Sequence, residues 1–288
     1  MTSTHPTSGD VNRRSFLKAS VAAGASAAAL SETAQPDAVQ AAYWPKPPRV
    51  ISIGSRRELF IDSHLVEQLK GAARQELHNP VARDLAIVHD APWEGNNCGY
   101  CSVFQDGYLY RMYYRGKQLS VVDGRLITNS HPEFYCYAES HDGIRWTKPD
   151  LGIVEFNGSK KNNIIWDGVG THNFSPFLDS RPGCPADQKY KALGGTMRQG
   201  GLFAFASPDG VRWRLLKKEP VITKGAFDSQ NLAFWDPERT LYVSYHRNFV
   251  NGVRAIMTCT SEDFVKWTEP VYLEYGDAPN QHLYTNAI

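Results

Sequence analysis

A seven-residue pattern occurs three times along this chain of 288 residues. Each copy places an Asp two residues after a Ser and a Trp four residues after that Asp. This spacing is typical of a tight turn with a strand on either side. The copies are Ser-His-Asp-Gly-Ile-Arg-Trp at 140–146, Ser-Pro-Asp-Gly-Val-Arg-Trp at 207–213 and Ser-Glu-Asp-Phe-Val-Lys-Trp at 261–267. A strand repeat of this period predicts a β-propeller, because stacked units bury faces that a single unit leaves exposed.

The repeated unit extends beyond the turn. The motif Leu-Tyr-x-x-Tyr-x-Arg ends at Arg115 in one unit and at Arg247 in another, and each copy follows an apolar run that ends in Asp106 or Asp236. Alternating side chains in these segments indicate strands with two different faces. The predicted fold class is therefore all-β, a propeller of four-stranded blades. We expect first-unit strands at 101–105, 108–114, 134–139 and 144–147, a second unit at about 173–222 and a third at about 227–273.

Three units are complete, and residues 282–288 resemble the first strand of a fourth. Propellers close with about four to eight blades, and an open arc leaves strand edges uncovered. We therefore expect 91–288 to be an incomplete propeller domain in a truncated form of a longer protein. The segment 42–90 is expected to be a lead-in that could supply a ring-closing strand.

The first 41 residues are predicted to be an export signal. Asn12-Arg13-Arg14-Ser15-Phe16-Leu17-Lys18 resembles the twin-arginine motif, the weakly apolar stretch 19–30 follows it, and 39–41 offers a small-residue cleavage site. An Ala-rich soluble helix is the alternative. The segment is too short for a lasting membrane anchor. We expect export machinery for folded proteins to be a partner, a periplasmic or extracellular location, and no integral membrane segment after signal removal.

Composition narrows the function classes. The net charge is +1 and no basic run stands out, so nucleic acid is not an expected partner. The 14 Tyr, 13 Phe and 7 Trp are mostly expected in the core, with a minority available to stack on sugars. Cys98 and Cys101 have redox-motif spacing but no surrounding βαβ pattern, and no second pair completes a metal site. No acidic run has calcium-loop spacing, so no cofactor is predicted.

Functional residues are expected where the first strand of each blade begins, because these strands line the central channel. The sequence Phe227-Asp228 ahead of Leu232-Ala233-Phe234-Trp235-Asp236 resembles the Arg-Asp-Pro strand of glycoside hydrolase family 32. The chain is thus similar, over about residues 90 to 288, to the five-bladed propeller glycosidases of families 32 and 43. The resemblance implies five blades when complete and three carboxylates around one sugar: a nucleophile or base, a stabilising Asp and an acidic Glu.

The implied carboxylates map onto the chain only in part. Asp228 matches the stabilising position. Asp228 stands eight residues before Asp236, but eight residues before Asp106 is Cys98, so the expected nucleophile is missing. Glu94, in the preceding loop, is the substitute candidate. The acidic Glu is unassigned, because Glu139 lies on a third strand that should face away from the channel.

Several other side chains are candidates for substrate binding. Arg115 and Arg247 end equivalent strands and either anchor neighbouring blades or bind a carboxylate or sulfate on a sugar. His172 and His246 suit sugar hydroxyls or proton transfer, although a lone His is often structural. Gln230 and Asn231 follow Asp228 in the same loop. The Asp of each seven-residue turn recurs in every unit, which favours a folding role over catalysis.

Three functions remain open from the sequence. The leading prediction is an exported glycoside hydrolase that acts on poly- or oligosaccharides, with Asp228 and Glu94 as catalytic carboxylates. The missing nucleophile favours an alternative, a carbohydrate-binding propeller without hydrolytic activity. A third hypothesis is a sialidase-like or lyase propeller that acts on acidic sugars, for which the two arginines are the evidence.

Overall fold

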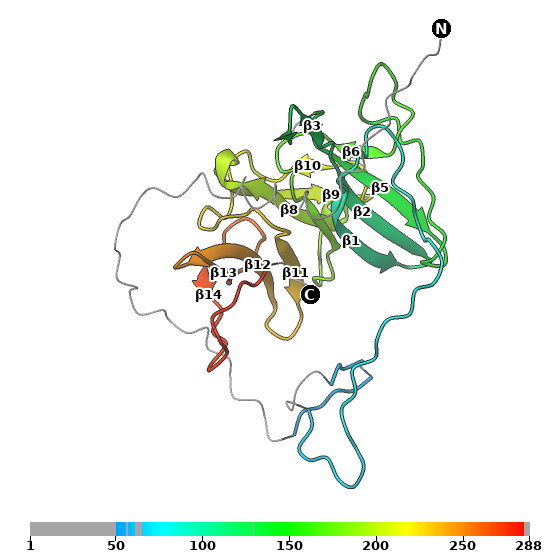
Figure 1. Ribbon diagram of the computed structural model, residues 1–288. Helices are drawn as coiled ribbons and strands as arrows, with labels where there is room; N and C mark the ends of the chain where they lie inside the picture. The colour runs from blue at the N-terminus through cyan, green and yellow to red at the C-terminus, as the bar shows by residue number, and fades with distance from the viewer. Residues whose placement is uncertain (1–49, 56, 61–64, 129, 285–288) are drawn as a thin grey trace.

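The computed structural model describes residues 50–55, 57–60, 65–128 and 130–284. Three four-stranded antiparallel sheets lie side by side (Figure 1), and no α-helix occurs in these residues. The predicted all-β class with four-stranded blades is therefore confirmed. The twin-arginine motif, the cleavage site and the end of the expected fourth-unit strand fall outside the described residues.

Each blade is one sheet with a simple up-and-down order. Blade 1 contains β1 (Gly99–Asp106), β2 (Leu109–Gly116), β5 (Phe134–Ser140) and β6 (Ile164–Trp166). Blade 2 contains β7 (Ser175–Leu178), β8 (Tyr190–Thr196), β9 (Gly201–Ser207) and β10 (Arg214–Leu215). Blade 3 contains β11 (Leu232–Asp236), β12 (Leu241–Val250), β13 (Val253–Ser261) and β14 (Val271–Tyr272). A separate ribbon of β3 (Ser120–Val122) and β4 (Arg125–Ile127) extends the connection between β2 and β5.

The fourth strand of blade 1 is not where the sequence placed it. Residues 144–147 form no strand, and Thr147 makes only an isolated bridge to Glu139. The strand next to β5 is instead β6, which follows a long connection. The prediction was wrong because only Thr147 pairs with β5 after the turn, and β6 pairs with β5 at Tyr135 and Cys136. Of the segment 42–90, the described part contains no strand and runs outside the sheets (Figure 1).

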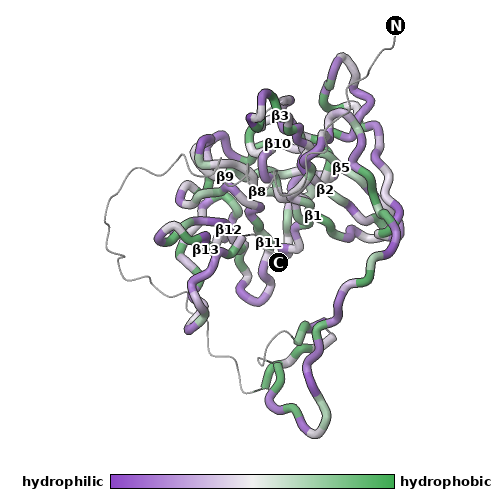
Figure 2. Tube along the Cα trace, viewed as in Figure 1, coloured by the Kyte–Doolittle hydropathy of each residue, from purple (hydrophilic) through white to green (hydrophobic). Residues whose placement is uncertain are grey.

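Aromatic side chains fill the spaces between blades, and the apolar stretches of Figure 2 follow the central strands. Between blades 1 and 2, Tyr113 and Tyr137 meet Phe174, Phe205 and Trp213. Between blades 2 and 3, Leu193 and Phe227 share a second cluster with Tyr242 and Phe264. Rings of this size bury large apolar areas, so the aromatic content predicted for the core is mainly used to stack the blades.

A repeated hydrogen bond also joins neighbouring blades. The carboxylate of Asp106, at the end of β1, accepts the hydroxyl of Tyr190 on blade 2. The register places Asp179, just after β7, in the equivalent position, and it accepts the hydroxyl of Tyr242 on blade 3 at 2.6 Å. The Asp that ends the inner strand thus connects blade 1 to blade 2 and blade 2 to blade 3.

The seven-residue turns are self-contained hydrogen-bonded loops. In blade 2 the Ser207 hydroxyl accepts the backbone N–H of Gly210 at 2.8 Å, and Asp209 Oδ1 accepts the N–H groups of Val211 and Arg212 at 2.8 and 2.7 Å. The copies at Ser140 and Ser261 make the same bonds. The carboxylates at these turns are occupied by the backbone, as expected for a folding role.

Removing the buried hydroxyl of this turn should destabilise the fold. Ser207→Ala leaves the buried Gly210 N–H without its acceptor, and we expect a loss of about 1–2 kcal/mol in the free energy of unfolding, measured by chemical denaturation. Arg212→Ala is the control, because that side chain is 73% exposed and should change stability little. Equal losses in the two variants would contradict the role of the turn.

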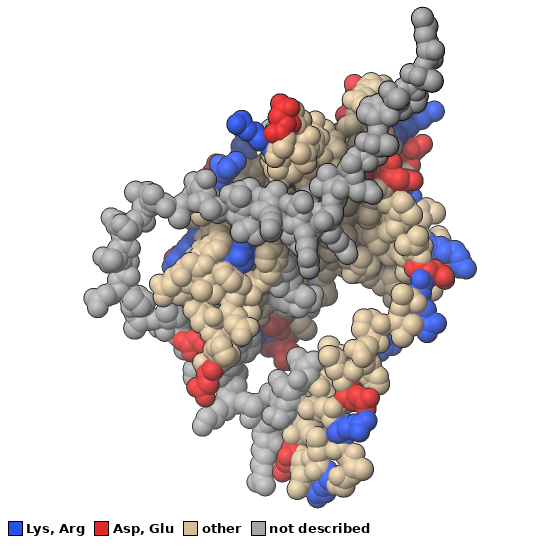
Figure 3. Space-filling model, in the orientation of Figure 1, with Lys and Arg blue, Asp and Glu red and all other residues tan. Residues whose placement is uncertain are grey.

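No helix in the described ranges is long and apolar enough to cross a membrane. On the face shown in Figure 3, acidic and basic side chains are interspersed, and neither sign gathers into one large patch.

Candidate functional site

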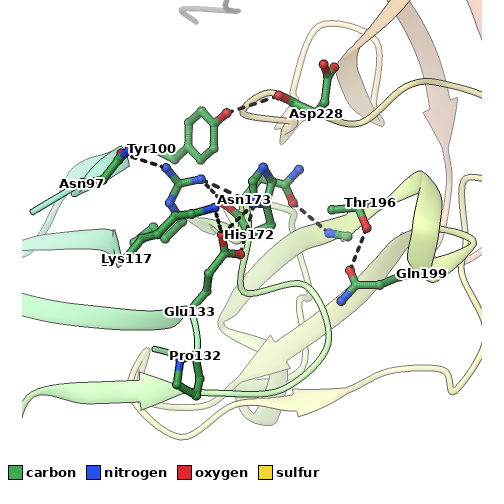
Figure 4. Close-up of polar contacts among 12 residues, drawn as sticks. Asn97, Tyr100, Lys117, Pro132, Glu133, His172, Asn173, Thr196, Gln199 and Asp228 are labelled. Atoms are coloured by element: carbon green, nitrogen blue, oxygen red, sulfur yellow. Dashed lines mark hydrogen bonds and ion pairs between the residues drawn. The ribbon is translucent and has the colours of Figure 1, made fainter. Parts of the chain in front are cut away.

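The candidate site lies where the inner strands β1, β7 and β11 begin. Tyr100 of β1, His172 and Asn173 ahead of β7, and Asp228 ahead of β11 come together there (Figure 4). Hydrogen bonds connect blades 1 and 3 at this point. Gln230 donates to the Cys101 carbonyl at 3.1 Å, and the Tyr100 hydroxyl donates to the Asp228 carbonyl at 3.2 Å. The starts of the inner strands therefore converge, as the channel argument predicted.

The loop that carries Asp228 is held through its backbone. The amide of the fully buried Asn173 donates to the carbonyls of Phe227 and Ser229 at 2.6 and 3.0 Å. Phe227 has a φ of 56°, a left-handed conformation that a bulky residue adopts only when its surroundings enforce it. The side chain of Asp228 takes no part in this anchoring and is 50% exposed. The loop thus presents one carboxylate to solvent from a fixed backbone.

Arg247 lies beneath this loop. Its Nη1 is 3.3 Å from Asp228 Oδ1, its guanidinium stacks 4.6 Å from the centre of the Tyr284 ring, and its side chain is 2% exposed. On β12, Arg247 follows Tyr245, which pairs with Leu232 of β11. Its guanidinium is therefore directed toward the start of the inner strand.

Blade 1 contains the equivalent pair, with one change. Arg115 pairs with Gly99, and the register between β1 and β2 slips by one residue between Gly99 and Ser102. Tyr100 at this bulge has a φ of 53°. Because of the extra residue, the structural match of Asp228 is Asn97 and not Cys98, which corrects the count made from the sequence. Asn97 Oδ1 accepts Arg115 Nη2 at 3.4 Å, as Asp228 Oδ1 faces Arg247.

Blade 2 has no arginine at the corresponding place. The register aligns Gly195 with Arg115 and Arg247. A Cβ at Gly195 would lie 2.0 Å from the Gly201 carbonyl oxygen, so no side chain fits. The N–H of Gly195 instead donates to Asn173 Oδ1 at 2.9 Å. Asn173, which anchors the Asp228 loop, occupies this part of blade 2.

His172 belongs to a chain of polar contacts beside Arg115 (Figure 4). Glu133 accepts from Lys117 Nζ at 2.5 Å, and both of its oxygens lie 3.1 Å from His172 Nδ1. Burial alone would raise the pKa of Glu133, but the contacts with His172 and Lys117 lower it to about 2. Sequence reasoning did not find Glu133, because it lies in a connection without a motif. Arg115 Nη1 donates to the His172 carbonyl at 3.2 Å and stacks on the Tyr100 ring at 4.6 Å.

Glu94 does not join this group of side chains. It is fully buried and accepts hydrogen bonds from Tyr114 at 2.5 Å, Lys148 at 2.8 Å and the Ala91 N–H at 2.8 Å. Burial would raise its pKa, but these bonds and the neighbouring His89 lower it to about 2. The structure therefore gives Glu94 an anchoring role for the loop before β1. This geometry argues against the catalytic role predicted for it.

Three other predicted residues serve the architecture. His246 is fully buried against Phe227, its Nε2 lies 3.0 Å from the Lys224 carbonyl, and burial lowers its pKa to about 4. Asn231, also buried, donates to the Ser229 carbonyl at 2.9 Å. Gln230 bridges to Ser102 at 3.4 Å as well as to Cys101. These contacts position the site without presenting His246 or Asn231 to solvent.

Metal and thiol chemistry have no geometric support in the described part of the chain. No group of three or more His, Cys, Asp or Glu side chains there could hold a metal ion. Cys98 and Cys101 are free thiols, and burial raises the pKa of both, that of Cys98 to about 11. The arrangement instead offers one exposed carboxylate, two stacked arginines and a partly exposed histidine.

Comparisons of sequence give little overlap with known proteins. No protein-family model matches the chain. The chain is 29% and 30% identical, over 126 residues, to the uncharacterized proteins Rv1502 and MT1551 of Mycobacterium tuberculosis. The match covers 42% of this chain, and the chain spans 34% of the length of each of these curated relatives.

Solved structures with some likeness to the chain include three that are named for carbohydrate chemistry. A glycosyl hydrolase from Bacteroides ovatus has a TM-score of 0.39 at 17% identity, with 62% of this chain and 52% of that chain covered. A fructofuranosidase from Schwanniomyces occidentalis has a TM-score of 0.41 at 15% identity, with 67% of this chain and 37% of that chain covered. A β-1,2-mannobiose phosphorylase from Listeria innocua has a TM-score of 0.39 at 11% identity, with 64% of this chain and 61% of that chain covered. At such scores the likeness assigns no function, so a function has to be argued from the site itself.

Proposed function

We propose that the chain carries the sugar-binding centre of an exported, carbohydrate-active propeller and that its activity is glycoside hydrolysis. The observation that carries this proposal is the placement of Asp228. Its carboxylate is half-exposed at the meeting point of three inner strands, on a loop fixed by Asn173 and Tyr100. The export part rests on the twin-arginine motif at Asn12 to Lys18.

The chemistry fits a sugar ligand. A fixed carboxylate can accept bonds from sugar hydroxyls and stabilise the positive charge that develops at the anomeric carbon. Tyr100 and Tyr284 lie beside it and offer rings on which a sugar can stack. Glu133 is a poor proton donor at neutral pH, since its pKa is about 2. His172 is the better candidate for proton transfer, because its Nδ1 is oriented by Glu133 and no described residue bonds its Nε2.

A second function has a specific observation in its favour. In blade 1 the residue equivalent to Asp228 is Asn97, a neutral amide. A hydrolase that needs a carboxylate from each of these two blades would lack one of them. A carbohydrate-binding propeller without turnover needs neither.

A glycan screen separates these two functions. The purified chain is incubated with a panel of poly- and oligosaccharides, and both reducing-sugar release and binding are measured for each glycan. We expect release from at least one glycan. Binding without release from any glycan would contradict hydrolysis and select the binding function, and neither binding nor release would reject the proposed sugar-binding centre.

A further inference from the structure

We propose that Arg115 is the receptor for an anionic group, a carboxylate or a sulfate, carried by the glycan that this site binds. That the ligand is a glycan rests on the function proposed above, whereas its anionic group follows from the residues around Arg115 alone. Blade 1 would thus recognise the charge of the ligand.

The two equivalent arginines have different partners. Arg247 of blade 3 faces the carboxylate of Asp228 at 3.3 Å, so its charge is matched within the protein. Arg115 of blade 1 faces the amide of Asn97 at 3.4 Å, which supplies an oxygen but no negative charge. Two units with the same arginine therefore differ by one negative charge at the position that pairs with it.

The acidic side chain beside His172, that of Glu133, does not fill this gap. Glu133 is shared between Lys117 and His172. Arg115 makes no ion pair with any described residue, and its buried Nε has no hydrogen-bond partner there. Counting Arg115 and Lys117 as positive and Glu133 as negative leaves one uncompensated positive charge, on a side chain that is only 7% exposed.

A buried cation without a counter-ion is costly, and burial also strengthens its attraction for an anion. The groups that surround the Arg115 guanidinium, namely Asn97, Tyr100 and His172, are all partly exposed, so a ligand can reach it between them. Its hydrogen bond to Asn97 is long, at 3.4 Å, and can be exchanged for a shorter one. The planar fork of a guanidinium fits the paired oxygens of a carboxylate or sulfate.

The test measures binding of the full chain to charged glycans and to their neutral forms. Uronate glycans are compared with their carboxyl-reduced forms, sulfated glycans with their desulfated forms, and inorganic sulfate is titrated alone. For at least one pair we expect the charged form to bind at least about tenfold more tightly, because a charge-assisted bond is gained. A preference confined to sulfated glycans supports the receptor and identifies a sulfate ester. Equal binding within every pair would overturn the proposal.

Two variants show whether Arg115 causes the preference. Asn97→Asp supplies the missing carboxylate, as Asp228 does for Arg247, and should abolish the preference while the protein stays folded. Arg115→Gln should abolish it by removing the charge. Arg145→Gln is the control, because that guanidinium is 88% exposed on a turn and should leave binding unchanged. An undiminished preference in Asn97→Asp, or an equal loss in Arg145→Gln, would overturn the assignment.

The proposed hydrolysis is tested separately by Asp228. Asp228→Asn is expected to retain or increase the preference for the charged glycan, because Arg115 keeps its surroundings and Arg247 loses its counter-charge. If the parent protein prefers charged glycans but releases no sugar, hydrolysis is rejected and the anion receptor at Arg115 stands. If the parent protein releases sugar but shows no charge preference, the anion receptor is rejected and hydrolysis stands.

Discussion

Asp228→Asn is expected to lower the rate of glycan release by about a thousandfold or more, because it removes a charge that faces the developing positive charge of the transition state. Binding of the intact glycan should change much less, since the amide oxygen still accepts bonds from hydroxyls. The measurement is kcat and KM on the glycan that the screen identifies. We expect the loss in kcat, because the interaction is strongest in the transition state.

Asparagine is the informative replacement at this position. Arg247 is buried and has Asp228 as its carboxylate partner, so alanine would leave the guanidinium with the backbone carbonyl of residue 228 but without a side-chain acceptor at that position. An amide oxygen retains that acceptor, as Asn97 does for Arg115 in the same protein. The thermal midpoint should therefore stay close to that of the parent.

The matched control is Asp123→Asn, an exposed Asp with a φ of 49° at the tip of the β3–β4 ribbon. Asparagine tolerates this conformation, so activity and stability should both remain. An unchanged kcat in Asp228→Asn would remove Asp228 from the reaction. A loss of activity accompanied by unfolding would assign it a structural role.

The sequence predicted the blades because their repeats are local. A turn such as that at Ser207 uses residues within one heptamer, and the Asp at the end of the inner strand in blades 1 and 2 bonds a Tyr hydroxyl of the next blade. The fourth strand of blade 1 was missed for the opposite reason. β6 pairs with β5 only after the long connection that follows Thr147, and nothing in a seven-residue window records that pairing.

The candidate residues that the structure brings together are those whose position along the chain could be compared between units. Arg115 and Arg247 come from equivalent strands, His172 and Asp228 from the segments that open blades 2 and 3, and Asp228 also from the resemblance to family 32. The bulge at Tyr100 shifts blade 1 by one residue, so simple counting reached Cys98 when the equivalent residue is Asn97. A left-handed tyrosine leaves no mark in composition or periodicity. Glu133 likewise becomes visible only when Lys117 and His172 are seen beside it.

The cluster around Asp179 is a further group that the sequence did not reveal. The Asp179 carboxylate accepts from Lys191 Nζ at 2.5 Å, from the Tyr242 hydroxyl at 2.6 Å and from Cys184 Sγ at 3.0 Å. The side chains of Lys191 and Asp179 are 1% and 0% exposed. Lys191 lies on β8 and Asp179 just after β7, so the ion pair is within blade 2, and the hydrogen bond from Tyr242 on β12 joins it to blade 3.

Asp179→Ala is therefore expected to lower the free energy of unfolding by about 3–5 kcal/mol, because it leaves the Lys191 ammonium buried without a counter-charge. Asp106→Ala is the matched control at the same place in the preceding repeat. Its lysine partner, Lys189, is 47% exposed and can be hydrated after the change, and Arg111, which lies 3.5 Å from Asp106, keeps its bonds to the Tyr137 hydroxyl and the Asp209 carbonyl. We expect a loss of about 1–2 kcal/mol there, of the size of a lost hydrogen bond. Both values come from denaturant unfolding.

The double variant Asp179→Leu with Lys191→Met tests the cause of this loss. Replacing a buried ion pair by apolar side chains of similar volume is often neutral, so the double variant should recover most of the stability lost in Asp179→Ala.

The pH dependence of the free energy of unfolding gives a second test of the buried charge. Burial raises the pKa of Asp179, but the bonds from Lys191 and Tyr242 outweigh it and the pKa is lowered. The resulting stabilisation is complete above the unfolded pKa of about 4 and is lost as the pH falls through the folded value. The difference in the free energy of unfolding between the parent and Asp179→Ala should thus become smaller in acid. A difference that does not change with pH, or an equal loss of stability in Asp106→Ala, would show that the buried charge does not stabilise the contact between blades 2 and 3.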